Sequence, residues 1–153
     1  MKPILFITPL LTAAFVLTGC VVFPQPQEEK TESLYWCPPA HSCVSTEAAT
    51  AFHRIQPFEL IMPMNEAWPI IRETVENMQG TSIQSEHEGY IYAHSYTRIF
   101  HFLDFFEVLA VPEENRLNVR SSSLIALTDL FANYFRTERF REALEEKGVI
   151  KRL

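Results

Sequence analysis

The spacing of hydrophobic positions after residue 62 follows two different periods, first that of a helix and then that of extended strands. Before these two regions, residues 54–62 (RIQPFELIM) predict a first strand. Pro57 places this strand at a sheet edge because proline cannot donate a backbone hydrogen bond to a neighbouring strand. Asn65 is a suitable N-cap for a following helix, and Gly80 suits its C′ position. Between them, apolar side chains recur at the spacing of one helix face, at Ala67, Ile71, Val75 and Met78.

From residue 81 the period changes to 2, which is typical of antiparallel strands joined by hairpins. Glu88-Gly89 is one turn sequence and Pro112–Asn115 is another. Pro112 suits the second position of a type I turn, and Asn115 tolerates the left-handed conformation that closes it. The four strands predicted in this way cover residues 81–87, 90–100, 102–111 and 116–127.

A second amphipathic helix is predicted near the C-terminus. Either Thr128 or Asn133 caps its start, and Gly148 ends it. An antiparallel sheet must bury one face, and two amphipathic helices are available to cover it. We therefore predict an α+β fold in which an antiparallel sheet of about five strands is covered by two helices, in the order β-α-β-β-β-β-α.

The first residues carry a targeting signal. Lys2 precedes an apolar run whose length suits a signal peptide and falls short of the roughly 20 residues of a spanning helix, although an uncleaved anchor stays an alternative. Leu17-Thr18-Gly19-Cys20 looks like the lipobox of bacterial lipoproteins, which predicts a signal peptide over residues 1–19 and acyl chains on Cys20. Val21 is not the aspartate of inner-membrane retention, so we expect the periplasmic face of the outer membrane.

The rest of the chain divides into a tether and one domain. Residues 20–33 are polar and proline-bearing, which predicts a flexible tether, and residues 34–153 are long enough for a single globular domain. Removing residues 1–19 takes away only Lys2 among the charged residues, leaving 12 basic against 19 acidic residues and a net charge of −7. Such an acidic domain repels phosphate backbones, so nucleic acid is not an expected partner.

Once Cys20 is lipidated, Cys37 and Cys43 remain as a pair in an oxidising compartment. Their spacing does not match the paired CxxC of a zinc site, and His41 between them is a lone candidate ligand. We therefore expect a small disulfide-closed loop. We expect no cofactor and no metal site.

Two segments are candidates for a binding site. Residues 96–106 are rich in aromatic side chains, which form either plain core or a pocket for a hydrophobic ligand. Their aromatic residues are Tyr96, Phe100, Phe102, Phe105 and Phe106. In the second segment, polar side chains could converge where the last strand meets the last helix, either as a structural lock or as an anion-binding corner. These are Arg120, Ser121, Ser123, Asp129, Asn133 and Arg136, with Asp129 expected within ion-pair reach of one of the two arginines.

The chain also resembles a known family. The motifs that carry the resemblance are CPPAHSCVST, EAWPIIRETVENM, GYIYAHS, FLDFFEV and RSSSLIALTDLFAN. Together they are similar to the DUF1499 family, a domain of unknown function in bacterial envelope proteins and some plastid proteins, over roughly residues 37–146. The matching positions are Cys37, Pro38, Cys43, Val44, Ser45, Asp104, Glu107, Arg120, Ser121, Ser123, Asp129 and Asn133. The chain departs from the family pattern at Ser42, Phe105, Leu124, Ala126 and Phe131.

The resemblance implies an envelope location and no particular activity. We expect a non-catalytic lipoprotein that acts as a binding or accessory module at the membrane surface, with an envelope protein as its partner. The alternative is a carrier of a small hydrophobic ligand or lipid. A hydrolase that works through the corner between Arg120 and Asn133 is a more distant third hypothesis.

Overall fold

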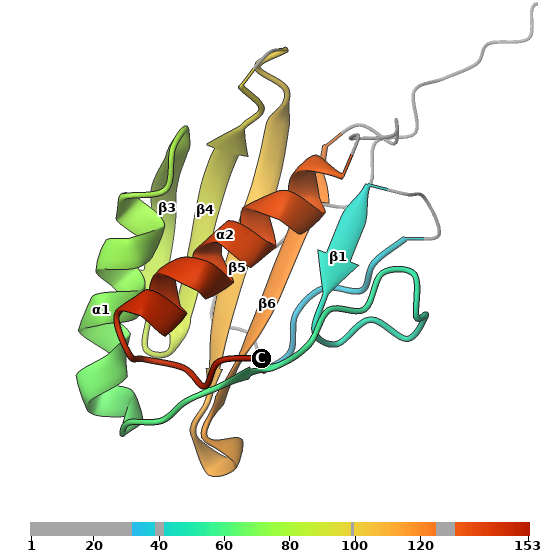
Figure 1. Cartoon of the computed structure of the whole chain (residues 1–153). Coiled ribbons are helices and arrows are strands. Elements are labelled where there is room, and N and C mark those ends of the chain that lie inside the picture. Colours follow the sequence, from blue (N-terminus) through green and yellow to red (C-terminus); the bar gives the residue numbers. More distant parts are fainter. Residues whose placement is uncertain (1–31, 39–41, 99, 125–130) are drawn as a thin grey trace, which may run out of the picture.

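The computed structural model describes residues 32–38, 42–98, 100–124 and 131–153, and it shows a six-stranded antiparallel sheet with two helices (Figure 1). The elements are β1 (Cys43–Ser45), β2 (Phe58–Glu59), α1 (Met64–Glu76), β3 (Thr81–His87), β4 (Tyr90–Tyr96), β5 (Leu103–Val111), the 3-10 helix η1 (Pro112–Glu114), β6 (Arg116–Ser123) and α2 (Ala132–Glu146). The predicted α+β class and the predicted order of strands and helices are confirmed, with β1 as an additional short strand.

Strand β6 lies between the rest of the sheet and two short strands. The sheet order is β1-β6-β5-β4-β3, and β2 also pairs with β6. Cys43–Ser45 lie opposite residues 120–122, whereas Phe58 and Glu59 lie opposite the start of β6. Both short strands therefore share one edge of β6, one near each of its ends.

The predicted hairpin turns are confirmed. Gly89 joins β3 to β4 with a φ of 77°, and η1 joins β5 to β6 with Asn115 in the left-handed conformation at φ 47°. The strand predicted over residues 90–100 ends earlier, at Tyr96. The Thr97 hydroxyl accepts a hydrogen bond from the backbone N–H of Phe102, which closes the connection to β5.

Several other predicted boundaries are wrong. Only Phe58 and Glu59 of residues 54–62 form a strand. Helix α1 has Pro63 as its N-cap without a side-chain hydrogen bond, so Asn65 lies inside the helix, and Asn77 rather than Gly80 follows its last turn. Asn133 lies inside α2, whose N-cap is Phe131 in the left-handed conformation, and Thr128 lies outside the described residues.

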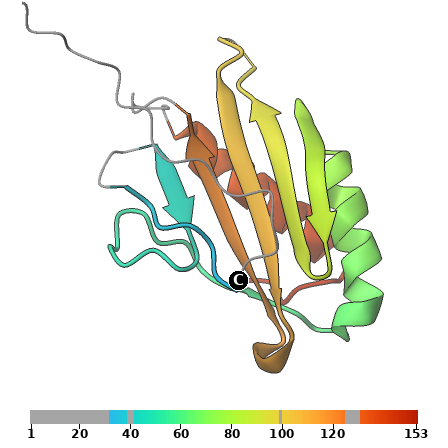
Figure 2. The same ribbon diagram turned by 180° about the vertical axis from the view of Figure 1, so that it is seen from behind.

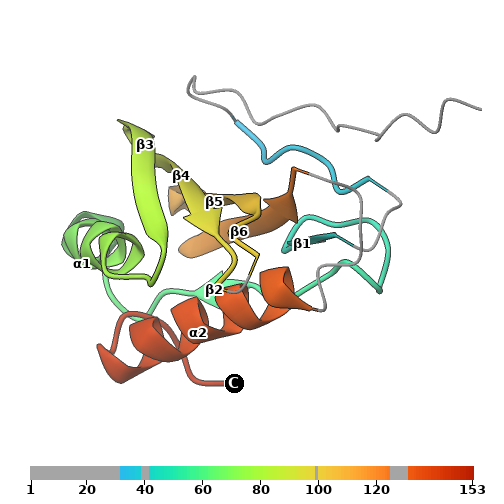
Figure 3. The ribbon, with the colours of Figure 1, turned by 90° about the horizontal axis from the view of Figure 1, so that it is seen from above.

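Alternate side chains of the sheet enter two separate layers. The face that α1 and α2 cover, here called the helix face, holds the main core, which includes Ile71, Phe106, Val119, Phe140 and Leu144. A second cluster lies on the opposite face and consists of Leu34, Tyr90, Tyr92, Phe105 and Leu109. Figures 2 and 3 show residues 33–38, here called the cover segment, on this opposite face, away from α2.

A disulfide attaches the cover segment to the sheet. Cys37 and Cys43 are bonded, as the sequence predicted, with their Cα atoms 5.6 Å apart. Near the other end of the segment, the backbone N–H of Leu34 donates to the Glu47 carboxylate at 2.9 Å, and that carboxylate also accepts from Asn118 of β6. The cover segment is thus held at both ends.

Reducing this disulfide should lower the free energy of unfolding by about 2 kcal/mol, because it releases a short closed loop in the unfolded chain. Urea unfolding with and without reductant measures the loss. Cys37→Ala is the control, since its stability should equal that of the reduced wild type and should not respond to reductant. Identical unfolding of the oxidised and reduced wild type would contradict the prediction.

Candidate functional site

The polar residues predicted to form one corner lie on two faces of the sheet. Ser121 and Ser123 point to the helix face, where they meet α2, whereas Arg120, the residue before Ser121, points to the opposite face and pairs with Glu107. The prediction of a single corner is therefore wrong for Arg120, because neighbouring residues of a strand alternate between faces. Asp129 lies outside the described residues.

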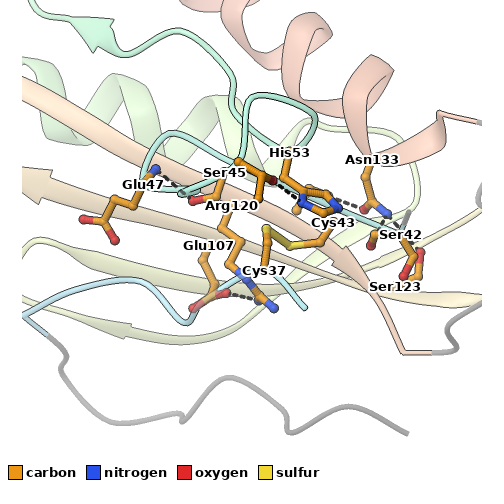
Figure 4. The surroundings of a disulfide bond; sticks show 12 residues. Cys37, Ser42, Cys43, Ser45, Glu47, His53, Glu107, Arg120, Ser123 and Asn133 are labelled. Carbon is orange, nitrogen blue, oxygen red and sulfur yellow. Dashed lines mark hydrogen bonds and ion pairs between the residues drawn. A yellow bond between two sulfur atoms is a disulfide. The ribbon is translucent and has the colours of Figure 1, made fainter. Parts of the chain in front are cut away.

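Asn133 is the centre of the polar network on the helix face. Its side-chain oxygen accepts from the Ser121 hydroxyl at 2.6 Å and from Arg136 at 2.8 Å. Its side-chain nitrogen donates to the Ser123 hydroxyl at 2.9 Å and to the backbone oxygen of Ser42 at 3.0 Å (Figure 4). One amide side chain therefore joins β6, α2 and the residue before β1.

Arg136 completes this network with a buried ion pair. Its guanidinium lies 2.5 Å from the Asp104 carboxylate of β5 and also donates to Ser121 at 2.8 Å. Asp104 and Ser121 are wholly inaccessible to solvent, so the Ser121 hydroxyl is not available to a substrate as a nucleophile. The network is a lock between helix and sheet, the structural alternative considered for these residues.

A second buried polar group lies beneath the cover segment. The Arg120 guanidinium lies 2.5 Å from the Glu107 carboxylate, directly across the β5–β6 ladder, and the Tyr90 hydroxyl donates to the same carboxylate at 2.9 Å. The ring of Tyr35, in the cover segment, lies 5.7 Å from the guanidinium carbon of Arg120. Figure 4 shows Arg120 and Glu107 directed toward one another, close to the disulfide.

Burial governs the protonation of this group. It raises the pKa of the Glu107 carboxyl above its ordinary value, while the charge of Arg120 and the hydrogen bonds from Arg120 and Tyr90 oppose that rise. The pKa of Tyr90 is raised by its own burial and by the carboxylate beside it. The family resemblance matched Glu107 and Arg120 separately, but only the strand register identifies them as partners.

The five aromatic residues predicted for a hydrophobic pocket do not line one cavity. Phe106 lies in the core on the helix face, whereas Phe105 lies in the cluster on the opposite face. Tyr96, Phe100 and Phe102 are exposed at the tip of the β4–β5 hairpin. The alternation of strand residues separates the first two, and the early end of β4 exposes the others.

The structure has a groove that the sequence did not predict. It has a volume of about 1070 Å³ and lies between α1, α2 and the adjoining ends of β3 and β4. Its lining includes Glu73, Met78, Tyr96, Arg98, His101, Phe135, Arg136, Arg139, Ala143 and Lys147. These residues come from α1, β4, α2 and their connections, so no local sequence pattern could have grouped them.

The groove carries positive charge. Arg136 is paired with Asp104, and Lys147 lies 3.6 Å from Glu73. No ion pair with a described residue involves Arg98 or Arg139, and both side chains are exposed. Two exposed arginines therefore lie on the groove.

The described part of the chain shows neither a clustered set of metal ligands nor a membrane-spanning helix. Among residues 32–38, 42–98, 100–124 and 131–153, no group of three or more histidine, cysteine and acidic side chains is arranged to hold a metal ion. No helix within these ranges is both long and apolar enough to cross a membrane. Cys20 and the predicted signal peptide and tether before Glu32 lie outside the described residues.

Replacing Arg120 by methionine should lower the free energy of unfolding by about 3 kcal/mol near neutral pH, because Glu107 would stay buried without its cation. The pKa of Glu107 in the folded variant would then lie further above its unfolded value. A raised folded pKa means that stability is retained below the unfolded pKa, near 4.5, and is lost as pH rises through the folded pKa. Urea unfolding at several pH values should show a deficit that grows with pH.

The double variant Arg120→Met/Glu107→Gln is the matched control. It removes both charges, so most of the lost stability should return near neutral pH. A deficit that is the same at all pH values, or that persists in the double variant, would mean that Arg120 stabilises the fold through packing alone.

Comparison with known proteins agrees with the family resemblance and adds no activity. No curated protein and no solved structure matches the chain significantly. The family model described as protein of unknown function (DUF1499) matches residues 33–144, which include the disulfide, both buried ion pairs and most of α2. The chain therefore belongs to the DUF1499 family.

Proposed function

We propose that the protein is a non-catalytic binding module, held at the surface of the bacterial outer membrane by a lipid on Cys20, and that its groove receives an anionic group of its ligand. The observation that carries the proposal is that two exposed arginines on the groove, Arg98 and Arg139, form no ion pair with a described residue. Their planar guanidinium groups suit carboxylate and phosphate oxygens, which they bind through two parallel hydrogen bonds.

The positive charge of the groove contrasts with the net negative charge of the whole chain. The full sequence has a net charge of −6, so most of the surface repels anions. The groove has the opposite balance, because its described lining holds Arg98, Arg139 and Lys147 against one carboxylate, that of Glu73. A local cationic site on an acidic protein favours one anionic partner at one position and keeps other anions away.

Binding is favoured over hydrolysis at the predicted corner because Ser121, Ser123 and Glu107 do not line the groove. Ser121 and Ser123 are buried and hydrogen-bonded, and Glu107 with its raised pKa lies beneath the cover segment on the other face of the sheet. A hydrolase that uses the corner between Arg120 and Asn133 would need these groups to meet at one accessible point. They lie on two faces instead.

A carrier of a hydrophobic ligand is the second candidate. Met78, Phe135 and Ala143 give part of the groove an apolar lining, and the volume suits a small lipid. The ligand would then be an amphiphile with its anionic group at the arginines. The two candidates differ in whether the apolar part of the ligand contributes to binding.

Lipidation is tested in living cells. Labelling with a palmitate analogue should mark the wild type and should not mark Cys20→Ala, because the thiol of Cys20 is the expected site of acylation. Membrane fractionation should place the labelled protein with the outer membrane. Equal labelling of the two proteins would refute the anchor.

Groove binding is tested by calorimetric titration of the purified protein with inorganic phosphate and with short-chain phosphatidylglycerol and phosphatidylcholine. The anionic probes should bind, and Arg139→Glu should weaken them at least about tenfold because it removes a charge-assisted hydrogen bond and adds repulsion. Arg152→Glu makes the same charge change at an exposed position outside the groove and should bind like the wild type.

Each remaining outcome has a defined meaning. Phosphate binding as strong as phosphatidylglycerol binding assigns the site to the anionic group alone. Equal binding of both lipids, together with a lipid that co-purifies in native mass spectrometry, favours the carrier. Equal binding of the anionic probes by wild type and Arg139→Glu, or no binding of any probe, overturns the groove as the site.

A further inference from the structure

We propose that one end of the domain, formed by the tip of the β4–β5 hairpin and the start of α2, docks on an anionic phospholipid bilayer. This end is here called the aromatic end. The inference goes beyond the proposed function, because a lipid-anchored binding module needs no second contact with the membrane. It predicts a fixed orientation of the domain at the surface.

The first observation is a concentration of exposed aromatic side chains. Among the described residues, eight large aromatic side chains are exposed, and six of them lie in these two segments. The hairpin tip contributes Tyr96, Phe100 and Phe102, and the start of α2 contributes Phe131, Tyr134 and Phe135. Single exposed hydrophobic residues are ordinary in proteins, but a contiguous group of them marks an interaction surface.

The two segments are neighbours in space. Tyr96 and Arg98 of the hairpin line the same groove as Phe135 and Arg139 of α2. Figure 1 shows the β4–β5 tip and the start of α2 at the same, upper end of the molecule. The two segments therefore adjoin at the groove through Tyr96 and Phe135, and the other exposed rings flank these two along the chain.

The fold presents these rings in a fixed arrangement. Phe100 and Phe102 are stacked with their ring centres 5.5 Å apart, and Tyr134 and Phe135 meet edge to face at 5.7 Å. The backbone of Thr97 donates to Phe102 and accepts from His101, so the hairpin tip is a closed, hydrogen-bonded turn. Exposure of the rings is thus a consequence of the folded backbone.

The charge of the aromatic end identifies its partner. Arg98, His101 and Arg139 lie among or beside the aromatic residues. Residues 95–103 and 131–137 hold no aspartate or glutamate, and Glu138, which follows them, is paired with Arg141. Aromatic side chains settle at the headgroup level of a bilayer, and basic side chains are attracted by anionic lipids. An anionic bilayer can accommodate both the aromatic rings and the basic side chains of the aromatic end. An apolar protein groove would match only the rings, and an acidic one would match only the basic side chains.

The second contact would orient the domain. A tether over residues 20–33 spans up to about 50 Å when extended, so an anchor on Cys20 leaves the domain free to rotate. Several acyl chains on Cys20 would attach the chain stably, but they would not orient the domain. Contact through the aromatic end would fix the orientation and would bring the groove opening to the lipid headgroups.

Co-sedimentation with sucrose-loaded vesicles tests the inference. The protein is the chain from residue 20 onward with Cys20→Ser, which carries no acyl chain, and the vesicles are phosphatidylethanolamine with or without phosphatidylglycerol. The wild-type domain should sediment with the anionic vesicles, less at high salt. Phe100→Ser/Phe102→Ser should weaken binding at least about tenfold, because two aromatic rings no longer enter the interface.

Phe52→Ser is the matched control. Phe52 is exposed to a similar degree as Phe100, but it lies in the loop between β1 and β2 and should not affect vesicle binding. Phe100 and Phe102 do not line the groove, so the double variant should still bind phosphate or phosphatidylglycerol monomers as the wild type does. This difference separates a failure of membrane docking from a failure of the proposed function.

Two results would overturn the inference. The first is equal sedimentation of the wild type and the double variant. The second is no sedimentation of the wild type with anionic vesicles. If, in that second case, crosslinking in cells captured an envelope protein that the double variant loses, the aromatic end would be a protein-binding surface.

Discussion

The alternation of side chains along β6 is the constraint on which the rest of the structure depends. Ser121 and Ser123 point toward α2, while Arg120 and Asn118 point toward the cover segment. The side chains on each face of β6 form hydrogen bonds or ion pairs with residues that are distant in the sequence. The position of α2, the position of the cover segment and the pairing of β1 therefore all follow from one strand.

The buried polar groups specify the register of the strands more than they raise the free energy of unfolding. Two arginine–carboxylate pairs are removed from water, and the desolvation of such pairs offsets much of their attraction. A shift of the β5–β6 register by one residue would bring Arg120 to the apolar core and would separate it from Glu107. Slipped pairings are thereby strongly disfavoured, which specifies one register for the central hairpin.

Local patterns predicted those parts of the fold that local interactions determine. The hairpin turns at Gly89 and Asn115 need residues that accept a positive φ, and the sequence supplies them at the required positions. The pairing of Cys37 with Cys43 followed from their number and spacing. The order of strands and helices followed from a change of hydrophobic period that extends over whole elements.

The missed features depend on contacts between distant segments. Strand β1 has only three residues, too few for a period, and it exists because β6 offers an unpaired edge. Asparagine is favoured at helix N-caps, but the side chain of Asn133 instead forms hydrogen bonds in the network that joins α2 to β6. The groove is assembled from α1, α2 and the sheet, so its arginines could be recognised only after folding had brought them together.

The attachment of the cover segment has a mechanical consequence. A pull on the chain from before residue 32 would act first on Leu34 and then on Tyr35, so their contacts would break one after the other. The covalent bond between Cys37 and Cys43 would then stop the peeling and transfer the load to β1, whose hydrogen bonds to β6 act together. The disulfide thus separates a soft outer layer, which extends under low force, from a sheet that resists it.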